Sequence, residues 1–111
     1  MIKQGGIYLV NFNPSKGTEA GKIRPALVVQ TDLLTRANHP STMVMPLTTQ
    51  LSSRGNVLRF HISSREQLMQ DSDVMLDQVR AIDNRRFCSE AIAQLTQDEW
   101  QQIKQMFCRL F

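Results

Sequence analysis

Short apolar runs and alternating apolar and polar residues occupy most of the chain before its last fifteen residues or so. Segments of this kind, rich in β-branched and aromatic residues and bounded by Gly, Pro, Asn or Ser, are typical of β-strands. The sequence predicts five strands, at residues 6–12, 24–30, 42–49, 56–62 and 73–82. Their close succession indicates an antiparallel sheet or a small barrel.

Individual residues refine the prediction for three of these strands. Pro25 and Pro46 have no N–H to give to a strand ladder, so each is expected at a strand start, an edge or a bulge. In the fourth strand, Phe60 and Ile62 share one face and Arg59 lies on the other. These details fit a sheet whose strands are locally interrupted.

The pattern changes near the C-terminus, where apolar residues recur at the three- and four-residue spacing of a helix. They are Trp100, Ile103, Met106, Phe107, Leu110 and Phe111. Thr96 and Glu99 have the spacing of a capping box, in which each side chain bonds the other's backbone N–H. The sequence therefore predicts a C-terminal helix whose apolar stripe packs on the sheet or, as the alternative, binds a partner. One short helical turn is also expected at residues 64–70.

Length and composition set the broad class of protein. With 111 residues and no linker or internal repeat, the chain is expected to form a single domain over residues 1–111. The absence of a long apolar run and of a signal-peptide pattern indicates a cytoplasmic protein. Cys88 and Cys108 lack the spacing of a zinc site and are expected as packed or free thiols. The formal charge of +3 permits a nucleic-acid partner without requiring one.

The segment KGTEAGKIRPALVV, residues 16–29, has the glycines and the Gly-Lys pair of a phosphate-binding loop. Such a loop needs four residues between its glycines, a Ser or Thr after the lysine, and a helix. Here three residues separate Gly17 from Gly21, Ile23 follows the lysine, and a strand comes next. This segment is therefore not a nucleotide-binding loop.

Three groups of polar residues adjoin the ends of apolar strands, where sites on small β-scaffolds are commonly built. They are Lys16, Glu19, Lys22 and Arg24 in the first loop, PLTTQ at residues 46–50, and DQVRAIDNRR at residues 77–86. Taken one at a time, these residues are more simply explained as exposed charges and turn residues. The residues alone leave both interpretations open.

Three segments together resemble the MazF/PemK family of toxin endoribonucleases in order and spacing. They are GGIYLVNFNPSKGTEAGKIRPALVVQ near the start, MPLTTQ, and LDQVRAID. The resemblance covers nearly the whole chain. It departs from the family pattern at Gly5-Gly6, where the family usually has Gly-Asp.

The resemblance implies a mainly β (α+β) fold, a small SH3-like antiparallel β-barrel with a C-terminal α-helix. It also implies a homodimer that cleaves single-stranded RNA at short sequence motifs, without a metal or other cofactor, and that a small antitoxin protein inhibits. By position, Arg24 and Thr48 match the family's catalytic residues, and Glu19 matches an acidic residue of the same loop. The candidate RNA-binding residues are Lys16, Lys22, Thr49, Gln50, Gln78 and Arg80.

These residue types suit the implied chemistry, in which the RNA supplies its own 2′-hydroxyl nucleophile. The enzyme must remove the hydroxyl proton, stabilise the charge on phosphorus and protonate the 5′-oxygen that leaves. The planar fork of Arg24 suits a phosphate that gains charge, and Thr48 can donate a hydrogen bond to it. Glu19 is a possible base if burial raises its pKa. The products would be a 2′,3′-cyclic phosphate and a 5′-hydroxyl.

Two other functions remain open for a chain of this fold. A CcdB-like toxin poisons DNA gyrase by protein contact, but it has no chemical use for an Arg24–Thr48 pair. A non-catalytic RNA-binding module is the other, but most of the few aromatic residues lie in apolar segments, where they would not stack on bases.

Overall fold

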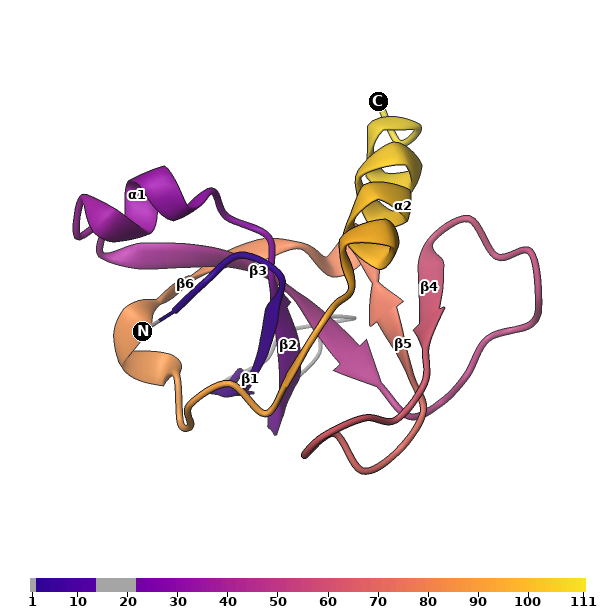
Figure 1. The fold of residues 1–111 in the computed structure, drawn as a ribbon, viewed down its shortest axis with the longest axis horizontal. Helices are drawn as coiled ribbons and strands as arrows, with labels where there is room; N and C mark the ends of the chain where they lie inside the picture. The colour runs from indigo at the N-terminus through magenta and orange to yellow at the C-terminus, as the bar shows by residue number, and fades with distance from the viewer. Residues whose placement is uncertain (1, 14–21) are drawn as a thin grey trace.

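A computed structural model describes residues 2–13 and 22–111 of the chain and shows a sheet that curls into half a barrel (Figure 1). The strands are β1 Gly6–Asn11, β2 Ile23–Val28, β3 Ser41–Thr48, β4 Arg59–Ile62, β5 Ser72–Met75, β6 Arg80–Asp83 and β7 Ala93–Gln94. The helices are α1 Asp32–Arg36 and α2 Gln97–Cys108, with short 3-10 turns η1 Leu76–Gln78 and η2 Asn84–Arg86. The strands pair antiparallel in the order β4-β5-β3-β2-β1-β7, and β6 also pairs with β3. The mainly β fold with a C-terminal helix, expected from the sequence, is confirmed.

The central strands bury side chains on both faces of the sheet. On one face, Ile7 lies opposite Leu27, and Leu27 lies opposite Met45. These three residues belong to a core cluster that also contains Ile103 of α2. Because side chains alternate along a strand, neighbours such as Val10 point to the opposite face, into a second buried cluster. Two-sided burial explains why β1 and β2 have apolar runs rather than strict alternation.

Strand β3 changes its partner halfway along its length. Val44 lies opposite Arg80 of β6, whereas Leu47 lies opposite Val74 of β5. From the first pair to the second, β3 advances by three residues, whereas the chain that runs from β5 to β6 covers six residues. The three extra residues of that chain form η1. The single strand predicted at residues 73–82 is therefore wrong: it is two strands separated by this insertion. Pro46 lies in the gap between the two partners, a local edge that needs no N–H.

Helix α2 forms as its sequence predicts. The Thr96 backbone N–H donates to Glu99 Oε1 at 2.8 Å, and the Glu99 N–H donates to Thr96 Oγ1 at 3.1 Å, which completes the capping box. Ile103 is buried against the sheet, and Trp100 is among the half-buried residues packed beside it. The apolar stripe thus packs on the sheet, although Phe111, beyond the helix, is 91% exposed.

Several other local predictions need correction. Residues 64–70 form a tight turn closed by a bridge between Arg65 and Leu68, not a helical turn. The fourth strand begins at Arg59 rather than at residue 56. Helix α1 was not predicted because its five residues include none that is buried, so no apolar periodicity marks it. It lies on the opposite side of the view in Figure 1 from α2.

The cysteines and the helices can each be compared with what the sequence predicts. Cys88 and Cys108 are free thiols, as one alternative foresaw, and both are exposed rather than packed. Among the helices of the described residues, none combines the length and apolar character that crossing a membrane requires.

Candidate active site

A cleft of about 890 Å³ opens where β2 and β3 separate. Ala26 lies opposite Pro46, but β2 extends from there back to Ile23 with only β1 beside it, while β3 turns toward β5. Pro25 lies in this one-sided part of β2, where a missing N–H costs no ladder bond to β3. The cleft is therefore a consequence of the change of partner along β3.

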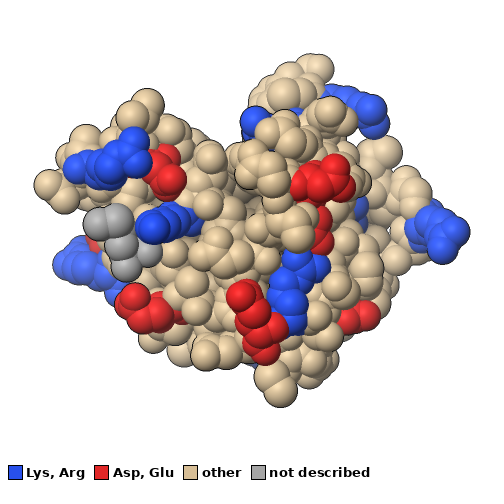
Figure 2. All heavy atoms as spheres, in the orientation of Figure 1, with Lys and Arg blue, Asp and Glu red and all other residues tan. Residues whose placement is uncertain are grey.

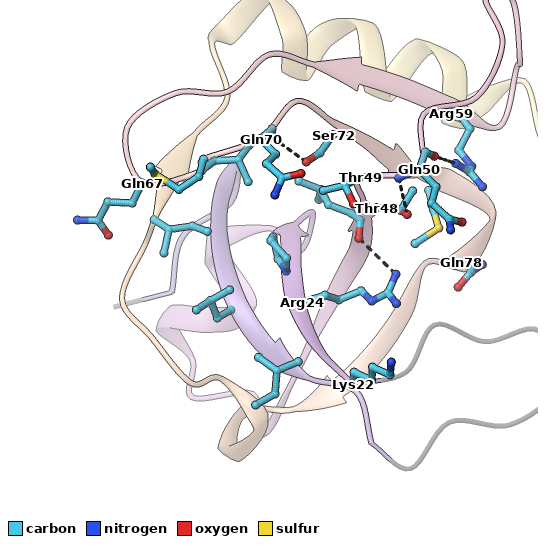
Figure 3. Close-up of a pocket in the computed structure, with 18 residues that line it drawn as sticks. Lys22, Arg24, Thr48, Thr49, Gln50, Arg59, Gln67, Gln70, Ser72 and Gln78 are labelled. Carbon is cyan, nitrogen blue, oxygen red and sulfur yellow. Dashed lines mark hydrogen bonds between the residues drawn. The ribbon is translucent and has the colours of Figure 1, made fainter.

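The cleft is lined by cationic, polar and apolar side chains, and Lys22, Arg24 and Arg59 lie on the side of the view in Figure 3 away from Gln67. Its polar residues are Lys22, Arg24, Thr48, Thr49, Gln50, Arg59, Gln67, Gln70, Ser72 and Gln78. Its apolar residues are Leu9, Ile23, Pro25, Leu47, Leu68, Met69, Met75 and Ile92. The described lining has three cationic side chains and no Asp, Glu or His, so it favours an anionic ligand.

Arg24 extends from the start of β2 across the gap to the end of β3. One guanidinium nitrogen, Nη1, donates to the Leu47 carbonyl at a distance of 3.5 Å. Arginine has five N–H donors in a planar fork, so this one contact orients the group without using all of its donors. The contact brings the guanidinium beside Thr48, the next residue of β3.

Thr48 ends β3 with its hydroxyl engaged on one side only among the described residues. Thr48 Oγ1 accepts a hydrogen bond from the Gln50 backbone N–H at 3.2 Å. Because that contact uses a lone pair, the hydroxyl proton remains able to donate to another oxygen. Thr49 and Gln50 are exposed on the same stretch of cleft wall. We call residues 48–50 together with Arg59 the polar wall.

Lys22 stands at the edge of the cleft, where the described chain resumes after residue 13. Its backbone has a φ of 67°, its N–H donates to Asn13 Oδ1 at 2.8 Å, and its carbonyl accepts from Phe12 at 2.9 Å. These bonds tie the two ends of the intervening segment together. The predicted site residues Lys16 and Glu19 lie in that segment, outside the described residues.

Gln78 and Arg80, both predicted to bind RNA, lie in different surroundings. Gln78, in η1, lines the cleft opposite the end of β3. Arg80 is not among the lining residues; its guanidinium carbon lies 5.7 Å from the centre of the Phe12 ring. The η1 insertion thus brings Gln78 to the cleft and leaves Arg80 beside the core.

Asp73 has a buried carboxylate that contacts Arg59 of the polar wall and the backbone just after Gln50. Asp73 Oδ2 accepts from the Ser52 backbone N–H at 2.7 Å and lies 3.7 Å from Arg59 Nη1, while Oδ1 lies 3.4 Å from His61 Nδ1. Burial alone would raise the pKa of Asp73, but the Ser52 and His61 contacts outweigh it, so this pKa lies below the usual value. Arg59 Nη1 in turn donates to the Gln50 carbonyl at 3.4 Å.

Residues 65–70, which we call the turn wall, close the other side of the cleft. Arg65 makes two hydrogen bonds to the carboxylate of Glu99 in α2, at 2.5 and 2.8 Å. This contact lowers the pKa of Glu99 and raises that of Arg65. The Gln67 N–H also donates to the Ile92 carbonyl at 2.8 Å. The turn wall is therefore fixed to α2 and to the segment before β7.

The lining residues that the sequence did not mark as part of a site include Arg59, Gln67, Met69 and Gln70. Arg59 carried a weak signal, since it lies on the polar face of an alternating strand. The other three belong to a turn whose place beside the cleft depends on the tertiary fold, and no local pattern marks them.

Gly6, which departs from the family pattern, has a clear structural setting. A Cβ atom at this position would lie 2.8 Å from Tyr8 Cε1 and 3.2 Å from the Lys3 carbonyl oxygen. The Tyr8 ring therefore fills the space that a side chain at position 6 would need. Tyr8 Oη accepts a hydrogen bond from the Lys3 N–H at 2.9 Å.

Charged side chains of both signs are mixed on the face shown in Figure 2. Over residues 2–13 and 22–111, no three His, Cys, Asp or Glu side chains are grouped so that they could hold a metal ion.

Comparisons with known proteins give a consistent result. Residues 3–111 match the family model for a PemK-like, MazF-like toxin of type II toxin-antitoxin system. The chain is 31% identical over 87 residues to Endoribonuclease EndoA of Bacillus subtilis (strain 168), a match that covers 78% of this chain and 74% of that protein.

Solved structures share the fold. The crystal structure of MazF (Form-I) from Deinococcus radiodurans aligns with a TM-score of 0.80 at 22% identity, over 98% of this chain and 94% of that one. The crystal structure of MazE-MazF (Form-II) from the same organism aligns with a TM-score of 0.74 at 18% identity, over 98% and 93%.

Proposed function

The chain belongs to the family of PemK-like, MazF-like toxins of type II toxin–antitoxin systems, and we propose that it is an endoribonuclease that cuts single-stranded RNA in the cleft between β2 and β3. The main support is the convergence of Arg24 and Thr48 on one cationic cleft. A relative that is 31% identical is named an endoribonuclease, which agrees with this assignment. RNA is an anionic ligand of the kind that such a cleft attracts.

The proposed reaction begins with attack of a ribose 2′-oxygen on the adjacent phosphorus. The 2′-hydroxyl proton goes to a base, the new P–O2′ bond forms, and the P–O5′ bond breaks. The 5′-oxygen then takes up a proton, which leaves a 2′,3′-cyclic phosphate and a 5′-hydroxyl. No oxidant, reductant or further reactant is needed, and the reaction is proposed to need no metal.

Each catalytic residue has a defined part in this reaction. Arg24 stabilises the charge that builds on the phosphate oxygens, because its planar fork can donate to two of them. Thr48 donates its hydroxyl proton to a phosphate oxygen while its own oxygen stays bonded to Gln50. Glu19 is the proposed base; the described lining of the cleft has no carboxylate and no imidazole.

The remaining roles concern binding and control. Lys22, Thr49, Gln50 and Gln78 line the cleft and are proposed to contact the RNA, while Lys16 and Arg80 would act from outside the described lining. We further propose that the chain is a single-domain cytoplasmic toxin and that it forms a homodimer. A cognate antitoxin is proposed to inhibit it. Structural neighbours titled MazE-MazF support the proposal that an antitoxin binds this chain.

Mapping of cleavage ends across a long RNA tests this function directly. The purified protein should cut at a recurrent short motif and leave 2′,3′-cyclic phosphate and 5′-hydroxyl ends. Intact RNA after long incubation, with inhibition of gyrase in a supercoiling assay, would favour the CcdB-like alternative instead.

A further inference from the structure

Apolar side chains form a platform at the end of the cleft away from the polar wall. Leu9 lies opposite Pro25, and Ile23 is two residues before Pro25, so the three side chains share one face of the β1–β2 pair. Ile92 adjoins them, since its N–H donates to the Ile7 carbonyl at 2.8 Å. Ile23 is 56% exposed. The platform, defined as Leu9, Ile23, Pro25 and Ile92, therefore presents apolar surface to the cleft.

The turn wall adds an apolar side chain and an amide to this platform. Met69, which is 81% exposed, lines the same cleft. In Figure 3 the Gln70 amide points into the cleft toward Arg24, whereas the Gln67 amide points away from it. The Gln70 backbone is fixed because Ser72 Oγ donates to its carbonyl at 3.0 Å. Across residues 2–13 and 22–111, nothing hydrogen-bonds to the Gln70 amide.

This combination matches the chemistry of one nucleotide. A nucleotide joins an anionic phosphate to a flat base, whose faces are apolar and whose edge carries donors and acceptors. A glutamine amide has a donor beside an acceptor and can bond such an edge twice. A methionine and aliphatic side chains suit the faces of the ring. Arg24 lines the same cleft and has guanidinium donors that can bind the phosphate of that nucleotide.

We propose that the platform, Met69 and Gln70 form a nucleobase subsite, in which Gln70 selects the base of a nucleotide adjoining the phosphate at Arg24. This subsite rests on the proposed function, since the ligand is RNA. The turn wall is suited to selection because the Arg65–Glu99 contact and the Gln67–Ile92 hydrogen bond hold its backbone in place.

Cleavage of an RNA library, with every base randomised around the cut site, tests the subsite. Wild type is compared with Gln70→Ala, Gln70→Leu and Gln67→Ala, the last being a matched control on the same turn. Both Gln70 variants should lose roughly tenfold base discrimination at a single position next to the cut. Gln67→Ala should keep the wild-type preference. Unchanged preference in both Gln70 variants, or the same loss in Gln67→Ala, would overturn the proposal.

A binding measurement separates this proposal from the proposed function. Oligonucleotides with 2′-deoxyribose throughout and one varied base are titrated against wild type and Gln70→Leu by fluorescence anisotropy. Wild type should distinguish the bases at one position and Gln70→Leu should not. If wild type discriminates but never cuts RNA, only the proposed function fails. If it binds all bases equally at every position, the subsite fails even where cleavage is observed.

Discussion

The two walls of the cleft are held by different kinds of contact. The turn wall is tied to α2 by two hydrogen bonds between Arg65 and Glu99, whose side chains are about one-fifth exposed. The polar wall is supported by Asp73, a carboxylate that is 2% exposed, through the Ser52 N–H and Arg59. The two walls therefore have different proposed parts: the polar wall supplies Thr48 to the reaction, while the turn wall shapes the cleft and selects the base.

Removal of the Arg24 guanidinium should have the largest effect on activity. Arg24→Ala is expected to lower kcat for RNA cleavage by about 10²–10³-fold, the usual cost of losing one donor to developing charge. The melting temperature should change by only a few degrees, because Arg24 is half-buried and its bond to the Leu47 carbonyl is long. Arg36→Ala, at the exposed end of α1, is the matched control and should retain full activity. Wild-type kcat in Arg24→Ala would remove Arg24 from the catalytic machinery.

Loss of the Thr48 hydroxyl should have the next largest effect. Thr48→Val keeps the shape of the side chain and removes both its donor and its bond to Gln50, so kcat should fall about 10–100-fold. Thr48→Ser restores the hydroxyl and should recover most of this loss. Equal activity of the valine and serine variants, measured on the same RNA, would show that the hydroxyl has no part in the reaction.

The Arg65–Glu99 contact is expected to affect stability far more than chemistry. Arg65→Ala should lower the free energy of unfolding by about 1–3 kcal/mol, since it removes two charge-assisted hydrogen bonds from a partly buried site. Urea unfolding of Arg65→Ala, Glu99→Ala and the double variant gives the coupling energy of the pair. Glu99→Ala should cost more than Arg65→Ala because it also removes the capping box. Additive single effects would mean that the pair does not fix the turn wall.

Acid should lower the free energy of unfolding by a small amount, because protonation of Asp73 weakens its support of the polar wall. Because the pKa of Asp73 is lower in the folded protein than its usual value, its contribution to stability is full above about pH 4. That contribution is lost as the pH falls through the lowered pKa. Unfolding in urea between pH 2 and pH 6 should therefore show a shallower dependence on pH in Asp73→Asn than in wild type. Parallel curves for the two proteins would contradict this role of Asp73.

Helix α2 could be predicted because the information that specifies it is local. Its cap, formed by Thr96 and Glu99, and its apolar stripe all lie within one short segment. The residues Arg24 and Thr48 could also be selected beforehand, but only through a resemblance to a known family. Their position at one cleft now has a physical basis in the contact of Arg24 with the Leu47 carbonyl.

The cleft itself could not be predicted from local sequence. It depends on the three-residue insertion at Leu76–Gln78, which turns one expected strand into two and lets β3 exchange β6 for β5. The first four residues of that expected strand, 73–76, are all buried, so alternation gave no sign of the break. Gln70 faces Arg24 across the cleft although 46 positions separate them in the chain, and such contacts depend on the whole fold.

The proposed cleavage mechanism requires the RNA to provide its own 2′-hydroxyl nucleophile in this cleft. The most direct measurement compares two RNAs in excess EDTA, identical except for one 2′-deoxyribose on the 5′ side of the mapped scissile phosphate. We expect wild type to cut the all-ribose strand and to leave the substituted strand intact at that phosphate, with Arg24→Ala about 10²–10³-fold slower on the all-ribose strand. Equal cleavage of the two strands at that phosphate would contradict the proposed mechanism.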